Sequence, residues 1–312
     1  MTSVSPSQLN QVFVRLDAIQ ATLNEIIVGK PEKITLAVTC LLAKGHLLIE
    51  GMPGEGKTTL AQAIAAVIGL DYQRIQFTND LLPTDILGLS MYSRENESFT
   101  FHPGPVFSQL LLVDEVNRAT PKTQSALLEA MAEKQVTIEG KTRPLPTPFN
   151  VIATQNPTEQ LGTYPLPESQ LDRFLMRLQL GYASREAERA ILIGEDRRSL
   201  IDRLQSVVGA NDFIHLQAKV NHQHCSEALL DYLQDIIEYT RTSHLFSCGL
   251  STRASQGLLQ VAKAHSLLQH RDHVLPEDIQ AVLPCVVDHR LTAADLNQSI
   301  ASEIIHNHVP VR

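Results

Sequence analysis

The stretch that decides the fold is Gly51-Met52-Pro53-Gly54-Glu55-Gly56-Lys57-Thr58. It follows the apolar run Leu47-Leu48-Ile49 and precedes the helical pattern Thr59 to Ala65, so a buried strand turns through a glycine loop into a helix. Glycines let the backbone approach a phosphate group and direct its N–H groups inward. This pattern predicts a phosphate-binding loop, because a chance match arises in only about one chain in a hundred of this length.

Two side chains of the loop have specific expected roles. Lys57 supplies a mobile cation for the β- and γ-phosphates of a nucleotide, and the hydroxyl of Thr58 can bind Mg²⁺. The backbone of the loop is expected to surround the phosphates. The nucleotide contacts predicted from this stretch are Gly51, Pro53, Gly54, Glu55, Gly56, Lys57, Thr58 and Thr59.

Size and composition set the broad class. The chain has 312 residues, of which 43% are hydrophobic and 19% charged, so it can form one large core and a second, smaller one. The net charge is −8, from 26 basic and 34 acidic residues, which argues against a general nucleic-acid or membrane-surface binder. Two domains of a globular protein are therefore expected.

The sequence also indicates a compartment. Met1 to Asn10 is polar and lacks the apolar segment of a signal peptide, and no later apolar run is long enough for a membrane-spanning helix. The cysteines are scattered without CxxC spacing, so they are expected to be reduced thiols in a cytoplasmic protein. They are Cys40, Cys225, Cys248 and Cys285.

A metal site at His222, His224 and Cys225 was weighed as an alternative. These residues are close in sequence and are of types that bind zinc. No second ligand pair has zinc-type spacing, however, and no HExxH motif occurs. Solvated histidines in the C-terminal half are the favoured interpretation.

Strand and helix patterns alternate along the first half of the chain. Apolar runs at 47–49, 72–77, 110–113 and 149–154 have helical patterns between them, which predicts a parallel sheet with helices on both faces. After Gly181 helical segments follow one another, and they are expected around 184–196, 226–242, 252–269 and 276–287. The predicted fold is an α/β phosphate-loop domain over 1–181, followed by a small all-α domain over 182–312.

A second constellation lies at the end of the run Leu110 to Val113. Asp114 and Glu115 follow directly, where a parallel sheet presents ligands at the carboxyl ends of its strands. Asp114 would hold Mg²⁺, and Glu115 would polarise the attacking water as a general base. Strands commonly end in acidic residues, but the phosphate loop upstream strengthens the assignment. The second carboxylate favours ATP hydrolysis over a GTP switch, and no NKxD motif occurs.

Three further polar residues are candidates for the site. Asn156 closes the run Phe149 to Thr154 and is expected to orient water or contact the γ-phosphate; the alternative is a turn signal formed with Pro157. Arg173 lies at the exit of the α/β part, and a solvated arginine at a helix end is its alternative. Arg253 lies at the start of a helix, where a surface residue near the cap is the alternative.

These positions, in this order, resemble the AAA+ ATPases, and within them most closely the MoxR family. The resemblance covers roughly residues 25–290 and depends on long, specific blocks. The blocks are Gly51–Thr59, Thr78–Asp85, Pro103–Phe107, Asp114–Ala119, Lys122–Met131, Ala153–Pro157, Gly162–Glu168 and Asp172–Phe174.

The resemblance implies a role for several single residues. It implies a hexamer with nucleotide at the subunit boundary, in which Asn156 is the first sensor and Arg173 is an arginine finger that reaches a neighbour. Arg253 corresponds to the sensor arginine of the all-α lid domain. Val28 and Gly29 match the segment that contacts adenine.

The resemblance also explains two extra segments and shows two departures. The family's insertion within its second helix corresponds to about 78–106, and its hairpin before the sensor strand to about 134–147. Lys30 replaces the glutamine usual in the family, and Thr252 replaces the common proline before the sensor arginine. These departures concern fine contacts rather than the activity.

The implied function is that of a Mg²⁺-dependent ATPase that remodels, assembles or activates a partner protein. In this family the partner is often a protein with a von Willebrand A domain or a metalloenzyme awaiting maturation. Membrane insertion is not expected, and nucleic acid is an unfavoured partner.

Three rival functions remain open at this point. A nucleic-acid motor has its only support in Lys134, Lys141 and Arg143 near the second hairpin. A metal-chelatase motor subunit and a nucleotide-gated scaffold with negligible turnover are the others, since a fold does not determine the client.

Overall fold

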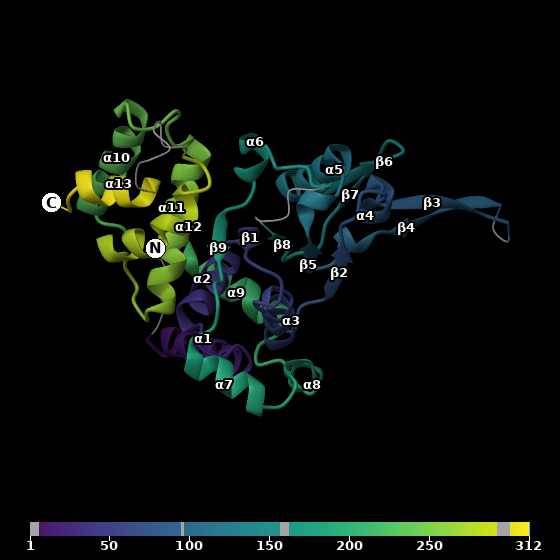
Figure 1. Cartoon of the computed structure of the whole chain (residues 1–312), viewed down its shortest axis with the longest axis horizontal. Coiled ribbons are helices and arrows are strands. Elements are labelled where there is room, and N and C mark those ends of the chain that lie inside the picture. Colours follow the sequence, from purple (N-terminus) through teal and green to yellow (C-terminus); the bar gives the residue numbers. More distant parts are fainter. Residues whose placement is uncertain (1–5, 95–96, 157–161, 292–299, 312) are drawn as a thin grey trace.

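The computed structural model describes residues 6–94, 97–156, 162–291 and 300–311. Within these residues, five parallel strands form a central sheet in the order β2-β5-β8-β1-β9 (Figure 1). The parallel sheet predicted from the alternation of strand and helix patterns is confirmed. Its strands are β1 (Leu47–Glu50), β2 (Tyr72–Gln76), β5 (Leu110–Asp114), β8 (Asn150–Gln155) and β9 (Met176–Gln179).

Strand β9 was not predicted. It has four residues, and its apolar side chains, Met176 and Leu178, alternate with Arg177 and Gln179. It lies at the edge of the sheet and pairs with β1 from Leu47 to Glu50. So short a run gives no signal of its own in the sequence, because the pairing with a distant strand is what stabilises it.

The two faces of the sheet bury alternate residues of each strand. In β1, Leu47 and Ile49 belong to one apolar cluster, whereas Leu48 belongs to the cluster on the opposite face. The first face is covered by α1 (Pro6–Ile26), α2 (Pro31–Leu42) and α3 (Lys57–Ile68). The second face is covered by α4 (Pro83–Leu87) and α5 (Pro121–Glu133).

The insertion and the hairpin before the sensor strand each contain an antiparallel pair of strands. The insertion contains α4 and the antiparallel pair β3 (Gly88–Ser93) and β4 (Ser98–Pro103), which projects away from the rest of the molecule (Figure 1). A 3₁₀ turn at Pro105–Phe107 follows. The second hairpin pairs β6 (Gln135–Ile138) with β7 (Lys141–Pro144).

Parts of several predictions lie outside the described residues. They are the first residues of the polar N-terminus, Glu95 and Asn96 of the insertion, and Pro157 of the alternative Asn-Pro turn. Among the described helices, none combines the length and the apolar character needed to cross a membrane.

The C-terminal part is helical, as predicted, but it contains more helices than expected. Between its described helices, the only strand-like pairing is an isolated bridge between His224 and His273. The helices at Arg197–Asp202, Ala210–Val220 and Ala301–His308 were not predicted, although Phe213, Leu216 and Val220 of the second have helical spacing and were a usable signal. The helices are α7 (Arg185–Ile193), α8 (Arg197–Asp202), α9 (Ala210–Val220), α10 (Glu227–Thr242), α11 (Thr252–Leu268), α12 (Pro276–Val287) and α13 (Ala301–His308).

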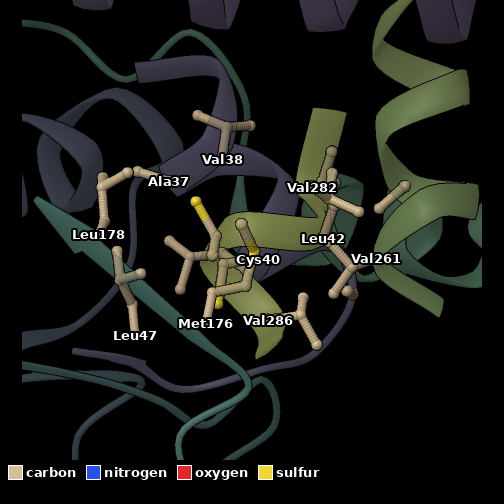
Figure 2. Close-up of a cluster of buried hydrophobic side chains, with 14 of the residues drawn as sticks. Ala37, Val38, Cys40, Leu42, Leu47, Met176, Leu178, Val261, Val282 and Val286 are labelled. Carbon is tan, nitrogen blue, oxygen red and sulfur yellow. The ribbon is translucent and has the colours of Figure 1, made fainter. Parts of the chain in front are cut away.

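The sheet and the C-terminal helices share one apolar core. Figure 2 shows side chains of α2, among them Val38 and Leu42, between the strand residues Leu47 and Met176 and the helix residue Val261. Helix α11 packs directly against α2 and against α12, and α12 also packs against β9. The C-terminal helices therefore lie beside the amino end of β9, which determines where Arg253 is placed.

Candidate active site

The glycine loop leaves the carboxyl end of β1 and enters α3. Gly54 and Gly56 both have φ of 88°, in the left-handed region that favours glycine. A Cβ atom at either position would have no neighbour within 4 Å, so the space beside the loop is open. The first N–H groups of α3 have no partner inside the helix, which is the usual setting for a bound phosphate.

A cavity of about 320 Å³ opens beside this loop. It brings together the predicted phosphate-loop residues, both carboxylates and Asn156, which come from the carboxyl ends of β1, β5 and β8. Gly51 and Glu55 belong to the loop but do not line the cavity. The lining residues are Pro53, Gly54, Gly56, Lys57, Thr58, Thr59, Arg74, Gln76, Asp114, Glu115, Thr154 and Asn156.

Asp114 is buried at the base of this cavity and is surrounded by polar groups. Both of its carboxylate oxygens lie 3.4 Å from Thr58 Oγ1, and the hydroxyl of Thr154 donates to Oδ1 at 3.1 Å. Arg74 Nε donates to Oδ2 at 2.7 Å. A carboxylate beside a hydroxyl is the hard oxygen donor set that Mg²⁺ prefers, so Asp114 and Thr58 fit this ion.

Glu115 has an unusual backbone conformation. Its φ of 57° and ψ of 52° place a residue with a side chain in the left-handed region, at a cost of about 1–2 kcal/mol. The Glu115 N–H donates to Thr154 Oγ1 at 3.0 Å. Its Oε2 accepts from Gln76 Nε2 at 2.8 Å and from Arg118 Nε at 2.9 Å. The backbone turn thus brings the carboxylate to the cavity, where two side chains from different elements hold it.

The predicted adenine segment lies beside the loop rather than in the cavity. Lys30 is buried, and its Nζ donates to the carbonyl of Glu55 at 3.1 Å and to that of Gly181 at 2.6 Å. Burial lowers the pKa of this ammonium. Val28 is half-buried, and Gly29 has φ of 78° with a Cβ position only 2.4 Å from Ala187 Cβ. The absence of a side chain at Gly29 therefore allows Ala187 of α7 to pack closely against it.

Lys57 contacts its own loop in this structure. Its Nζ donates to the carbonyl of Gly51, at the start of the loop. The carboxylate of Glu55 lies against Gly51, and its Oε2 is buried with no hydrogen-bond partner in the described part of the chain. Both side chains thus face the backbone that would surround a phosphate.

Arg173 and Arg253 lie elsewhere, in a second cavity of about 550 Å³. This cavity is also lined by Gly45 and His46, which precede β1, so it lies at the amino edge of the sheet. Four residues of β1 at ~3.3 Å per residue separate the two edges by about 13 Å. One chain therefore does not bring either arginine to its own phosphate loop.

The two arginines have few partners within the chain. Arg173 Nη1 donates to the carbonyl of Leu128 at 2.8 Å. Arg253 is exposed, and within the described ranges its side chain makes no hydrogen bond or ion pair. Their guanidinium groups are thus available to a ligand brought by another molecule.

The alternative metal site has little support in the geometry. His222 and His224 are exposed, and the backbone of His224 pairs with the segment Asp272 to Val274. Among the residues that the structure describes, no group of three or more His, Cys, Asp or Glu side chains could hold a metal ion.

Comparisons with known proteins agree with this geometry. A family model described as "ATPase family associated with various cellular activities (AAA)" matches residues 46–176, and one for an AAA lid domain matches 238–307. The chain is 41% identical to Chaperone MoxR1 of Mycobacterium tuberculosis, over 92% of this chain and 78% of that protein. The chain belongs to the MoxR family of AAA+ ATPases.

Other relatives of this MoxR-family chain are similar over most of their length. YeaC of Bacillus subtilis is 46% identical, covering 86% of this chain and 84% of that protein, and Protein MoxR of Paracoccus denitrificans is 32% identical, covering 91% of each. A crystal structure of a candidate ATPase from Cytophaga hutchinsonii superimposes with a TM-score of 0.87 at 37% identity, covering 96% of this chain and 95% of that one. The resemblance inferred from the motifs is confirmed.

Sequence reasoning missed three residues that line the cavity of this MoxR-family chain. Arg74 and Gln76 both lie on β2 and are two residues apart, so they face the same side of the strand. Thr154 precedes Asn156 by two residues on β8. The sequence of β2 does not alternate regularly, and only the pairing of β2 with β5 shows that these side chains reach Asp114 and Glu115.

Proposed function

We propose that this chain hydrolyses ATP with Mg²⁺ in a ring-shaped homo-oligomer and uses the reaction to remodel, assemble or activate a partner protein. The observation that carries the proposal is the separation of two sets of groups. The phosphate loop and both carboxylates share one cavity, whereas Arg173 and Arg253 share another at the opposite edge of the sheet.

The first cavity supports the hydrolytic part of the proposal. Lys57 and the N–H groups of the loop would bind the phosphates of ATP, and Thr58 with Asp114 would hold the metal ion. Mg²⁺ would neutralise charge on the β- and γ-phosphates. Glu115 would accept a proton from the attacking water. Its hydrogen bond to Gln76 or to Arg118 would first be replaced by one to that water.

Asn156 lines the same cavity at the end of β8, on the strand next to β5. Its amide would orient the water or contact the γ-phosphate as the first sensor. This assignment depends on its position beside Glu115 and on the family pattern. The role of Asn156 is thus part of the proposal.

The second cavity supports assembly. Arg173 and Arg253 would stabilise the charge on the γ-phosphate of a neighbouring chain, with Arg173 as the finger and Arg253 as the lid sensor. A contact between the phosphate-loop edge of one chain and the arginine edge of the next is heterologous, and such contacts close into rings when the rotation allows. A hexamer is the ring size that the family implies.

The partner is proposed from the family and from one exposed surface. The insertion hairpin presents large apolar side chains to solvent, with exposed fractions of 54% for Met91, 55% for Tyr92 and 72% for Phe99. Such a surface suits a protein client. The relative named a chaperone fits this class of function, and a von Willebrand A domain protein or a maturing metalloenzyme is the proposed client. The cytoplasm is the proposed compartment.

The nucleic-acid motor has less support. The net charge is −8, and the basic hairpin uses Arg143 internally. Its guanidinium lies 3.9 Å from the centroid of the Phe101 ring and donates to the carbonyls of Ile138 and Lys141. The chelatase subunit and the nucleotide-gated scaffold remain alternatives, and the following assay separates the scaffold from the proposal.

Parallel assays of nucleotide affinity and phosphate release test the proposed activity. Lys57→Ala is expected to weaken ATP binding, whereas Glu115→Gln keeps binding and suppresses turnover, because only Glu115 acts on water. Wild-type protein that binds ATP without releasing phosphate at any protein concentration would favour the scaffold. Stimulation of turnover by DNA at physiological salt would favour the motor.

A further inference from the structure

Arg290 is a buried arginine that links the C-terminal helices to the segment containing Arg173. It follows α12, and its side chain is 7% exposed. Its Nε donates to Asp172 Oδ1 at 2.8 Å, which forms an ion pair with that carboxylate. Its Nη2 donates to the carbonyl of Phe174 at 2.6 Å and to that of Asp172 at 3.4 Å. Arg290 therefore holds the residue on each side of Arg173.

The same guanidinium also reaches the start of β9 and its own helix. Its Nη1 donates to the carbonyls of Leu175, at 3.2 Å, and Val286. The neighbouring His289 donates from Nε2 to the carbonyl of Phe174 at 3.2 Å. Burial lowers the pKa of His289, which favours the neutral ring. The end of α12 is thus built around the backbone of residues 172–175.

The segment is also held by the fully buried Phe174 side chain and by backbone bonds to the short helix before it. The helix before it, α6 (Glu168–Leu171), has only four residues and no side-chain cap. The backbone N–H of Leu175 donates to the carbonyl of His46, which fixes the far end of the segment at β1. The Arg173 N–H donates to the carbonyl of Gln170 at 3.1 Å, and among the described residues its guanidinium donates to the carbonyl of Leu128 at 2.8 Å. The direction of the Arg173 side chain consequently depends on the backbone that Arg290 holds.

The cavity is strongly cationic. Arg173, Arg253 and Arg290 line it together with Lys44 and Lys134, and Asp172 is the one carboxylate in its lining. Asp172 pairs with Arg290, the most buried of the three guanidinium groups. The positive charge of Arg290 is thereby balanced, and Arg173 and Arg253 remain for an anionic ligand.

We propose that Arg290 is a positioning residue for Arg173. Through Arg290, the C-terminal helices set the direction of the Arg173 guanidinium, which contacts the nucleotide bound by a neighbouring chain. This inference rests on the proposed function. Arg290 touches no residue of its own phosphate-loop cavity, so its loss acts on the donor side of a subunit boundary. The chain that carries the change keeps an intact site for ATP.

Mixing variants tests this assignment. Arg290→Gln alone is expected to lower turnover per subunit by about 10- to 100-fold, since a misplaced group of this kind costs on the order of 10²-fold, while ATP affinity changes by less than about twofold. Mixed with Glu115→Gln, it is expected to recover activity. The Glu115→Gln chain donates a correctly held Arg173 to the intact site of the Arg290→Gln chain.

Two further variants separate positioning from folding. Arg290→Lys keeps the ion pair with Asp172 but loses the fork of bonds to the carbonyls, so an intermediate loss of turnover is expected. Arg177→Gln is the matched control. Arg177 also joins β9 to the end of α12. Its Nη2 donates to the carbonyl of Asp288 at 3.1 Å, and its Nη1 forms an ion pair with Glu50 Oε1 at 3.6 Å, but it lies away from Arg173. It is expected to change the melting temperature more than the turnover.

The outcomes separate this inference from the proposed function. The pair Arg173→Ala with Glu115→Gln reports on donation across the boundary by itself. If that pair recovers activity and Arg290→Gln with Glu115→Gln does not, Arg290 does not act on the donor side and the inference is wrong. Normal turnover by Arg290→Gln alone would also overturn it. If the Arg173 pair fails in verified mixed assemblies, donation across the boundary is wrong, and the inference is wrong with it.

Discussion

The two edges of the central sheet differ in how their charged side chains are satisfied. At the carboxyl edge, Asp114 pairs with Arg74, and Glu115 is held by Gln76 and Arg118. At the amino edge, Arg253 has no partner among the described residues, although it lies close to other cations. The first edge is balanced within one chain. The second has more cationic than anionic side chains in its lining, which suits an anionic ligand.

That difference is the basis of the proposal that one site needs two chains. Buried Asp114 and half-buried Glu115, in one cavity, suit a nucleotide and its metal ion. Half-buried Arg173 and exposed Arg253, beside a packed helical region, suit the phosphates of a neighbour. The following predictions test this comparison, beginning with the largest expected effect.

Arg173→Ala is expected to lower turnover by about 10³-fold or more, because arginine fingers contribute 10³ to 10⁵ in rate. ATP affinity is expected to stay the same, since Arg173 lies outside the phosphate-loop cavity. Steady-state phosphate release and equilibrium nucleotide binding measure the two quantities. Arg203→Ala, which removes an exposed ion pair with Glu195, is the control and should be neutral. Unchanged turnover in Arg173→Ala would remove the finger assignment.

Asp278→Asn is expected to destabilise the helical region that supports the amino edge. Asp278 is fully buried and accepts from His265 Nδ1 at 2.7 Å, from Arg271 Nη2 and from the backbone of Leu275 at 2.8 Å. Breaking a buried pair of this kind costs about 3 kcal/mol of unfolding free energy. Denaturant unfolding measures it, with Asp272→Asn, at an exposed pair with His273, as the control. Equal effects of the two changes would contradict the assigned burial.

Acid is expected to weaken the amino edge through His46. The ring accepts from the Val151 N–H at 3.0 Å and donates to the Met131 carbonyl at 3.2 Å, and burial lowers its pKa to about 4. The unfolded chain, with a pKa near 6.5, binds the proton more readily. Stability from this group is therefore complete above pH 6.5 and falls by about 3 kcal/mol as the pH drops to 4.

Denaturant unfolding at a series of pH values measures this loss. His46→Gln keeps polar atoms at the position but does not titrate, so its stability should vary less between pH 6.5 and 4 than that of the wild type. A pH dependence that is the same in both proteins would show that other groups cause it.

Arg74→Gln is expected to have the smallest effect, at the carboxyl edge. The guanidinium of Arg74 bonds to Asp114 Oδ2, an oxygen that could otherwise bind the metal ion. Its side chain is 45% exposed, so releasing this contact should lower the Mg²⁺ concentration needed for half-maximal ADP binding by about two- to fivefold. A fluorescent ADP analogue titrated with Mg²⁺ gives the value. The Mg²⁺ concentration for Arg74→Lys should lie between those of the wild type and Arg74→Gln. A higher Mg²⁺ requirement in Arg74→Gln than in the wild type would mean that Arg74 orients Asp114 for the ion.

The sequence predicts the carboxyl edge better than the amino edge. The loop from Gly51 to Thr58, the pair Asp114 and Glu115, and Asn156 each follow an apolar strand, so their convergence follows from the parallel sheet. Arg74 and Gln76 were missed because the pairing of β2 with β5, not a motif, brings them there.

The amino edge depends on packing between parts far apart in the chain. Strand β9 is visible only through its pairing with β1, and Arg290 reaches residues 172–175 from more than a hundred positions away. The shared cavity of Arg173 and Arg253 depends on the packing of α11 against α2 and of α12 against β9. No local sequence pattern encodes that packing. The motifs therefore identified both arginines, but they did not predict that the two line one cavity.

The central claim is that the site is completed across a subunit boundary, and turnover of Arg173→Ala mixed with Glu115→Gln tests it most directly. In random mixed rings at equal amounts, about a quarter of the boundaries join an intact Glu115 to an intact Arg173. Turnover should therefore be near zero for each variant alone and highest near equal amounts. Mixed assemblies verified by tagged co-purification that stay inactive at every ratio would contradict the claim.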